Sequence, residues 1–138
     1  MPLVLDTGPL LAALDAADPD HARCAELLSE ASEDLIVPTL VLAELAYWCH
    51  RRLGVDVWLT FLDDLLAGVY RPEHPTAGDL ERCRELQFKY KDQPLGVVDA
   101  SVLSLVERLG EDRLATLDHR HFATVRPAHV DALALLPA

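Results

Sequence analysis

Four acidic residues stand where the local sequence gives no reason for a carboxylate: Asp6, Glu44, Asp99 and Asp118. Asp6 and Asp118 each follow a short apolar run, which is typical of a buried strand in a parallel sheet. Asp99 lies among valine, alanine and leucine. Glu44 has only apolar residues three and four positions away on either side, so no basic side chain pairs with it along a helix. Carboxylates in such settings are candidates for binding a divalent cation.

Three of these acids also have a purely structural interpretation. Asp6 precedes Gly8-Pro9, so it can cap the N-terminus of a helix. Asp99 falls in the first turn of an expected helix, where a negative charge offsets the helix dipole. Glu44 can be a single solvent-exposed acid on an otherwise apolar helix face. The residues alone leave both interpretations open.

The elements that must position the four acids alternate between strand and helix along one domain, residues 1–138. This alternation favours an α/β architecture, with a mostly parallel sheet covered by helices on both faces. In such sheets ligands bind beyond the carboxyl ends of the strands, where the strand order reverses. Two of the acids end strands and two lie near helix starts, so all four should converge on that edge. We expect strands at 3–5, 35–37, 69–71, 113–117 and 130–136. Two helices should start at Gly8-Pro9 and Asp18-Pro19, and four more should cover 39–53, 55–67, 77–90 and 97–109. A turn or short helix should cover 118–122.

The charge balance makes a metal ion the natural occupant of this edge. Twelve Lys and Arg stand against 23 Asp and Glu, a formal net charge of −11, which argues against nucleic-acid binding by phosphate neutralisation alone. Two carboxylates about 4 Å apart repel by roughly 4 kcal/mol in an intermediate dielectric, and this repulsion should raise some of their pKa values. A divalent cation would relieve it. Oxygen ligands favour Mg²⁺ or Mn²⁺ over zinc.

Composition also bounds the class of protein. Hydrophobic residues make up 51% of the 138 residues, enough for a packed core, which excludes disorder as the dominant state. The apolar runs are too short to span a membrane, and no signal peptide is visible at the N-terminus. Three widely separated cysteines fit neither a zinc site nor a disulfide framework, so we expect a cytoplasmic protein.

Four segments, in order and spanning nearly the whole chain, resemble the PIN-domain family of nucleases, in particular the VapC-type toxins of bacterial toxin–antitoxin modules. They are Val4-Leu5-Asp6-Thr7-Gly8-Pro9-Leu10-Leu11, Ala43-Glu44-Leu45, Val98-Asp99-Ala100-Ser101 and Ala115-Thr116-Leu117-Asp118-His119-Arg120-His121-Phe122.

The resemblance implies a five-stranded parallel sheet flanked by helices and hydrolysis of RNA phosphodiester bonds with Mg²⁺ or Mn²⁺. It makes Asp6 and Asp99 direct metal ligands, while Glu44 and Asp118 bind a second ion or orient water. Thr7 and Thr116 resemble the hydroxyls that brace the site. Gly8 departs from the pattern, because many relatives have Ser or Asn there. A VapB-like antitoxin and a homodimer are the implied partners.

Other polar and aromatic residues have weaker assignments. Arg51, Arg52, Arg120 and Arg126 are the candidate positive rim for RNA. His119 and His121 flank Asp118, and we interpret them as phosphate contacts or turn caps rather than as metal ligands or a general base. The aromatic residues Tyr47, Trp48 and Trp58 are assigned to core packing or a dimer interface rather than to base stacking.

Two other classes of function compete with a nuclease. A phosphoacceptor signalling domain also places acids at strand ends with Mg²⁺, but it needs adjacent acids after the first strand and a lysine after the last, and neither is here. A catalytically inactive PIN-like binding module would not need all four acids. The sequence therefore favours a metal-dependent endoribonuclease.

Overall fold

The centre of the computed structural model, which describes residues 2–138, is a five-stranded sheet whose neighbouring strands are all parallel. The strand order is β3-β2-β1-β4-β5, so the chain builds outward from β1 in both directions and the order reverses between β1 and β4. The prediction of an α/β fold with a mostly parallel sheet is confirmed. The strands are β1 (Pro2–Leu5), β2 (Asp34–Pro38), β3 (Arg71–Glu73), β4 (Arg113–Ala115) and β5 (Ala134–Leu136).

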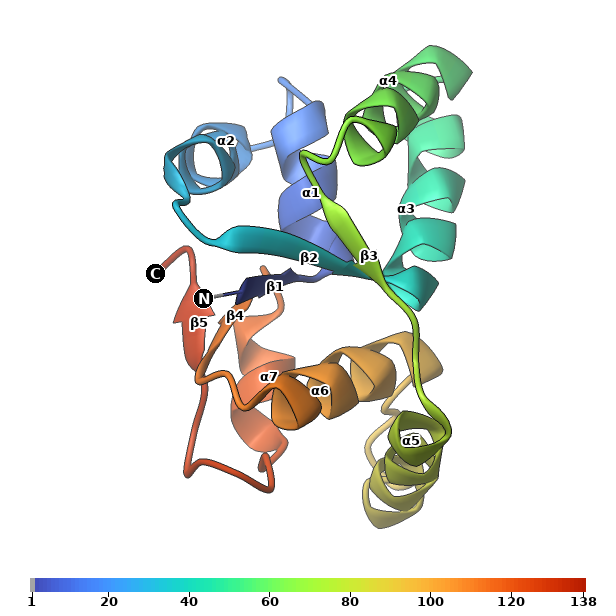
Figure 1. Ribbon diagram of the computed structural model, residues 1–138, viewed down its shortest axis with the longest axis vertical. Coiled ribbons are helices and arrows are strands. Elements are labelled where there is room, and N and C mark those ends of the chain that lie inside the picture. The colour runs from blue at the N-terminus through green and yellow to red at the C-terminus, as the bar shows by residue number, and fades with distance from the viewer. Residues whose placement is uncertain (1) are drawn as a thin grey trace.

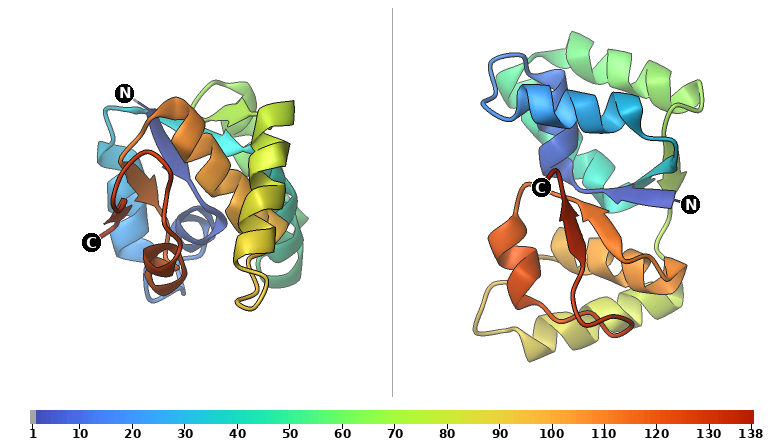
Figure 2. Two further views of the ribbon diagram at one scale, coloured as in Figure 1. Left: turned by 90° about the horizontal axis from the view of Figure 1, so that it is seen from below. Right: turned by 90° about the vertical axis from the view of Figure 1, so that its left-hand side faces the viewer.

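Helices cover both faces of the sheet. Helices α1 to α4 lie on one face and α5 to α7 on the other, as Figure 1 and the right-hand view of Figure 2 show. Within residues 2–138, no helix is long and apolar enough to cross a membrane. The helices are α1 (Thr7–Leu14), α2 (His21–Glu30), α3 (Thr39–Arg52), α4 (Val55–Leu66), α5 (Ala77–Lys89), α6 (Val97–Leu109) and α7 (His119–Thr124).

The hydrophobic core lies on both faces of the central strand. The residues Leu3, Val4 and Leu5 of β1 are almost fully buried, because helices cover the sheet on both sides. Helix α6 is the most enclosed helix, with an unbroken buried run from Ala100 to Val106. A parallel sheet sandwiched in this way fixes the position of its carboxyl edge rigidly.

Local signals placed several helix ends correctly. Thr76 and Asp79 form a reciprocal capping box at the start of α5, with both hydrogen bonds at 3.0 Å. Gly110 ends α6 in the left-handed conformation at φ +69°, which a glycine adopts without strain.

Other boundaries were predicted wrongly. Helix α2 begins at His21, not after Asp18, because the Asp18 carboxylate accepts the backbone N–H of Asp20 at 2.8 Å and closes a turn instead. Strand β3 covers 71–73 rather than 69–71, since the N–H of Val69 still bonds to the carbonyl of Asp64 at the end of α4. The last two strands are shorter than expected, at 113–115 and 134–136.

Candidate active site

Asp6 is held at the carboxyl end of β1 by contacts on both of its oxygens. Its backbone N–H donates to the carbonyl of Ala115 at 2.9 Å, which joins the ends of β1 and β4. Its Oδ1 accepts the N–H of Thr7 at 2.9 Å and caps α1, while its Oδ2 accepts the hydroxyl of Thr116 at 2.9 Å. Only 7% of Asp6 is exposed. The capping interpretation is therefore correct for this residue.

Asp118 follows β4 and is tied to Asp6 through one hydroxyl. Thr116 Oγ1, which donates to Asp6, also accepts the backbone N–H of Asp118 at 3.0 Å. Asp118 in turn caps α7, because its Oδ1 accepts the N–H of His121 at 3.1 Å. Asp118 is exposed, in contrast to Asp6. The strand ends thus present one buried and one exposed carboxylate.

Gly8 allows the start of α1 to approach this loop closely. A Cβ atom built on Gly8 would lie 3.2 Å from Cβ of Leu117, which is tighter than ordinary van der Waals contact. The residue that departs from the family pattern therefore fits a close packing of α1 against the loop before Asp118. A larger side chain would press on that loop.

Glu44 and Asp99 come from the two opposite helix layers. Glu44 lies on α3 and Asp99 in the first turn of α6, and both are half-buried. Together with Asp6 and Asp118 they line one open cleft at the carboxyl edge of the sheet, where the strand order reverses. The structure thus brings together all four acids expected from the sequence. The remaining residues that line the cleft are Thr7, Gly8, Leu11, Trp48, Arg52 and Leu117.

The cleft shifts the acid–base behaviour of two carboxyl groups. Burial raises the pKa of Asp6 to about 6; hydrogen bonds from Thr7 and Thr116 oppose this, and the charges of Asp99 and Glu44 reinforce it. Burial also raises the pKa of Asp99, with His121 opposing and the Asp118 and Glu44 charges reinforcing. The sequence predicted raised values from mutual repulsion. The direction agrees, but desolvation is the larger cause.

His121 lies between two of the acids. Its Nε2 is 3.8 Å from Asp99 Oδ2, and its Nδ1 is 3.6 Å from Asp118 Oδ2. One ligand atom from each of these three residues falls within 4.8 Å of the others, so the group is close enough to hold a metal ion. From the sequence we interpreted His121 as a phosphate contact or turn cap rather than as a metal ligand. The signal that could have found it is its spacing, because a residue three positions after the capping Asp118 returns to the same side of α7.

The residues of the cleft fit a divalent cation. Thr7 is 6% exposed, and its hydroxyl has no hydrogen-bond partner anywhere in residues 2–138. The half-buried carboxylates of Glu44 and Asp99 accept no hydrogen bond from the described part of the chain, so their oxygens are available to a cation. Oxygen atoms that accept no hydrogen bond from the protein are suitable ligands for Mg²⁺ and Mn²⁺.

The four candidate RNA-binding arginines separate into two groups. Arg52 lines the same cleft as Glu44, with its guanidinium over the ring of Trp48 at 4.9 Å. Arg120 lines an adjoining groove that Asp118 shares with the cleft. Arg51 instead lies over Tyr47, and Arg126 pairs with Asp131 at 3.8 Å beside a different depression. Only Arg52 and Arg120 border the acidic site.

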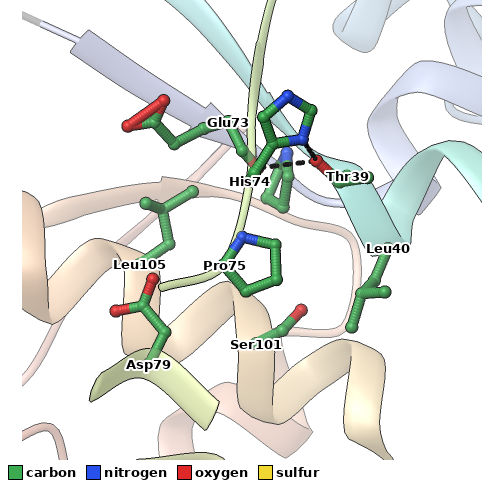
Figure 3. A pocket seen from close by; sticks show the side chains of 9 residues that line it. Thr39, Leu40, Glu73, His74, Pro75, Asp79, Ser101 and Leu105 are labelled. Carbon is green, nitrogen blue, oxygen red and sulfur yellow. Dashed lines mark hydrogen bonds between the residues drawn. The ribbon is translucent and has the colours of Figure 1, made fainter. Parts of the chain in front are cut away.

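A second, smaller pocket lies between the start of α3, the β3–α5 connection and α6 (Figure 3). Its polar groups are already paired. Thr39 Oγ1 donates to the carbonyl of Glu73 at 3.0 Å and lies 2.7 Å from Nδ1 of His74. The buried Asp79 carboxylate accepts the Nε of Arg108 at 3.0 Å as well as the capping N–H. This pocket is a structural junction that anchors α3, α5 and α6.

Comparison with known proteins identifies the family of this chain. The PIN domain family model matches residues 3–126. Ribonuclease VapC26 of Mycobacterium tuberculosis is 36% identical over 135 residues, covering 98% of this chain and all of that protein. The chain therefore belongs to the PIN-domain family, among the VapC ribonuclease toxins.

Two solved structures share the fold. The crystal structure of Mycobacterium tuberculosis VapC20, a toxin that cleaves the sarcin–ricin loop, superposes with a TM-score of 0.81 at 22% identity, covering 94% of this chain and 98% of that one. Rickettsia felis VapBC2, bound to a DNA fragment from its promoter, superposes with a TM-score of 0.71 at 20% identity, covering 98% and 97%. At these identities the likeness describes the fold.

Proposed function

We propose that this chain is a metal-dependent endoribonuclease and the toxin of a VapBC-type toxin–antitoxin module. The observation that carries the proposal is the convergence of Asp6, Glu44, Asp99 and Asp118 on one open cleft. Membership of the VapC ribonucleases supports RNA as the substrate. An inactive binding module would have no use for a cluster of carboxylates that repel one another.

Asp6 and Asp99 would hold the cation directly, while Glu44 and Asp118 would bind a second ion or orient water. A divalent cation there would neutralise charge on the phosphodiester and lower the pKa of a water molecule. Thr116 favours the ionised form of Asp6 by donating to its Oδ2, and it fixes the Asp118 backbone at the same time. The N–H of Thr7 orients the other oxygen of Asp6.

Arg52 and Arg120 would contact the RNA backbone on opposite sides of the acids. Arg52 comes from α3 on one face of the sheet, and Arg120 comes from α7 on the other. Because the protein is strongly acidic overall, cations at these two points would hold phosphates beside the cleft without attracting nucleic acid elsewhere. Arg51 and Arg126 remain candidates for contacts farther from the cleft.

A cognate antitoxin would bind this cleft with basic residues. An arginine fork matches carboxylates in a bidentate manner, and Asp99 and Glu44 have free oxygens to accept it within the described chain. The Rickettsia relative was crystallised as a VapBC complex. We also propose that the toxin pairs as a homodimer, as the family resemblance implies.

RNA cleavage by the purified chain tests the proposal. We expect cleavage with Mg²⁺ or Mn²⁺, loss with excess EDTA, and loss in Asp6→Asn and Asp99→Asn. The matched control is Asp63→Asn on α4, an exposed acid outside the cleft that should leave cleavage unchanged. Full activity of metal-free protein in EDTA would contradict the metal mechanism.

A further inference from the structure

We propose that His121 supplies an imidazole nitrogen to a cation held by Asp99 and Asp118, so that this part of the cleft selects Mn²⁺ over Mg²⁺. The inference rests on the proposed metal dependence and assigns a nitrogen ligand to what the sequence describes as an all-oxygen site.

The placement of the ring is the first support. His121 contacts both carboxylates, with its two ring nitrogens 3.8 Å from Asp99 Oδ2 and 3.6 Å from Asp118 Oδ2. These distances are longer than hydrogen bonds, so no short contact locks the ring in its present position. The ligand atoms lie within 4.8 Å of one another, and small side-chain movements would bring them onto one ion.

Helix α7 holds the backbone of His121 beside the cleft. Asp118 Oδ1 accepts the backbone N–H of His121 at 3.1 Å, which directs Oδ2 toward the ring and Asp99. The adjacent residue Phe122 is 96% buried, and its ring centroid lies 5.9 Å from that of His121, so α7 cannot rotate away from the cleft without exposing Phe122. The imidazole is therefore part of the cleft rather than a free surface group.

A separate observation indicates that a ligand belongs in the cleft. Thr7 lines the cleft and is 94% buried, and its hydroxyl has no hydrogen-bond partner within residues 2–138. A buried hydroxyl without a partner is uncommon, and a hydrated cation beside it would supply one.

The chemical consequence is selectivity. Mg²⁺ strongly prefers oxygen ligands, whereas Mn²⁺ accepts a mixed set of carboxylate and imidazole. Wild-type protein should therefore bind Mn²⁺ more tightly than Mg²⁺. Replacing His121 by Asn should weaken Mn²⁺ binding by at least about tenfold, because even an indirect partner of a metal ligand contributes that much. Mg²⁺ binding should change far less.

Pulsed EPR on the Mn²⁺-loaded protein tests the assignment independently of activity. We expect an imidazole ¹⁴N coupling to Mn²⁺ in wild type, its loss in His121→Asn, and its retention in His119→Asn, the other histidine of α7. Calorimetric titration of both variants with Mn²⁺ and with Mg²⁺ gives the affinities.

The outcomes separate this inference from the proposed function. Bound Mn²⁺ that supports RNA cleavage but shows no nitrogen coupling would overturn the role of His121 and leave the nuclease assignment standing. Equal losses of Mn²⁺ and Mg²⁺ affinity in His121→Asn would show a structural role and overturn it as well. Failure of wild type to bind either ion, with no cleavage, would reject both.

Discussion

The hydroxyl of Thr116 donates to Asp6 Oδ2 at 2.9 Å across 110 residues of sequence, and this bond joins the carboxyl ends of β1 and β4. The same oxygen accepts the N–H of Asp118, so a single side chain sets the separation of two acids in the cleft. A hydrogen bond to an ionised group stabilises that ionised form. Asp6 thus remains able to ionise although burial opposes it.

Replacing Thr116 by Val should raise the pKa of Asp6 further, because the shape is kept and the donor is lost. In EDTA at pH 7.5 we expect a loss of about 1.5–3 kcal/mol in the free energy of unfolding, and a smaller loss at pH 5, where Asp6 is protonated. The pH profile of RNA cleavage should shift to higher pH. Thr116→Ser, which keeps the hydroxyl, should behave like wild type in urea unfolding and in the pH profile.

The metal-free protein should lose stability as pH rises through about 6. The folded-state pKa of Asp6 is about 6, above the ordinary value near 4, so the folded form binds the proton more tightly than the unfolded form does. The raised pKa of Asp6 contributes about 3 kcal/mol to the free energy of unfolding. This stabilisation is fully present below pH 4 and is lost as pH rises through 6. Asp6→Asn should flatten the dependence in urea unfolding with EDTA. An unchanged slope would show that another group is responsible.

Asp99→Asn should leave the metal-free protein as stable as wild type or more stable. The substitution removes one charge from a partly buried acidic cleft at nearly constant shape, and the pKa of Asp99 is raised by burial. Wild type should gain about 2.7 kcal/mol from Mg²⁺ at one hundred times the dissociation constant, and the variant much less. Thermal melts in EDTA and in Mg²⁺ give both quantities. A variant clearly less stable in EDTA would identify Asp99 as a structural cap.

Gly8→Ala should lower the affinity for the cation more than it lowers the free energy of unfolding. The new Cβ would press on Leu117 at 3.2 Å and displace the loop that carries Asp118, while alanine gains about 1 kcal/mol of helix propensity. Gly78→Ala is the matched control, since Gly78 holds the equivalent second position of α5 with a nearest neighbour at 3.7 Å. Mn²⁺ affinity should fall only in Gly8→Ala. If the two variants bind Mn²⁺ equally well, the Leu117 side chain moves aside without displacing the loop.

Asp79→Ala should lower the stability of the protein and leave RNA cleavage unchanged, which is the opposite of what we expect for the cleft variants. Asp79 is 5% exposed and pairs with Arg108 outside the cleft, so its loss leaves a partly buried guanidinium without its main partner. We expect destabilisation of about 3 kcal/mol, together with normal cleavage per folded molecule at low temperature. Urea unfolding and single-turnover cleavage measure the two effects. Loss of cleavage in fully folded protein would extend the functional site to the pocket of Figure 3.

Short-range sequence signals predicted most of the fold. The run Leu3–Leu5 is apolar throughout because the strand is covered on both faces, and this pattern is legible without any partner strand. Thr76 and Gly110 bound α5 and α6 through contacts within a few residues. The start of α2 was missed because Asp18 can cap a turn or a helix equally well, and only the packing of His21, whose ring Nδ1 lies 2.8 Å from the carbonyl of Ala12, distinguishes them.

The sequence by itself indicated which four acids line the cleft, because three of them sit at a strand end or helix start that a parallel sheet gathers at one edge. The fourth, Glu44, lies in the second turn of α3, where it has no basic partner along the helix. Tertiary structure alone decided how they differ: Asp6 is buried with two donors, whereas Asp118 is exposed and caps α7. It also decided that His121, Arg52 and Arg120 border the cleft while Arg51 and Arg126 do not. The physical reason is that a residue's burial and neighbours depend on how helices from opposite faces pack at that edge, and no local sequence pattern specifies that packing.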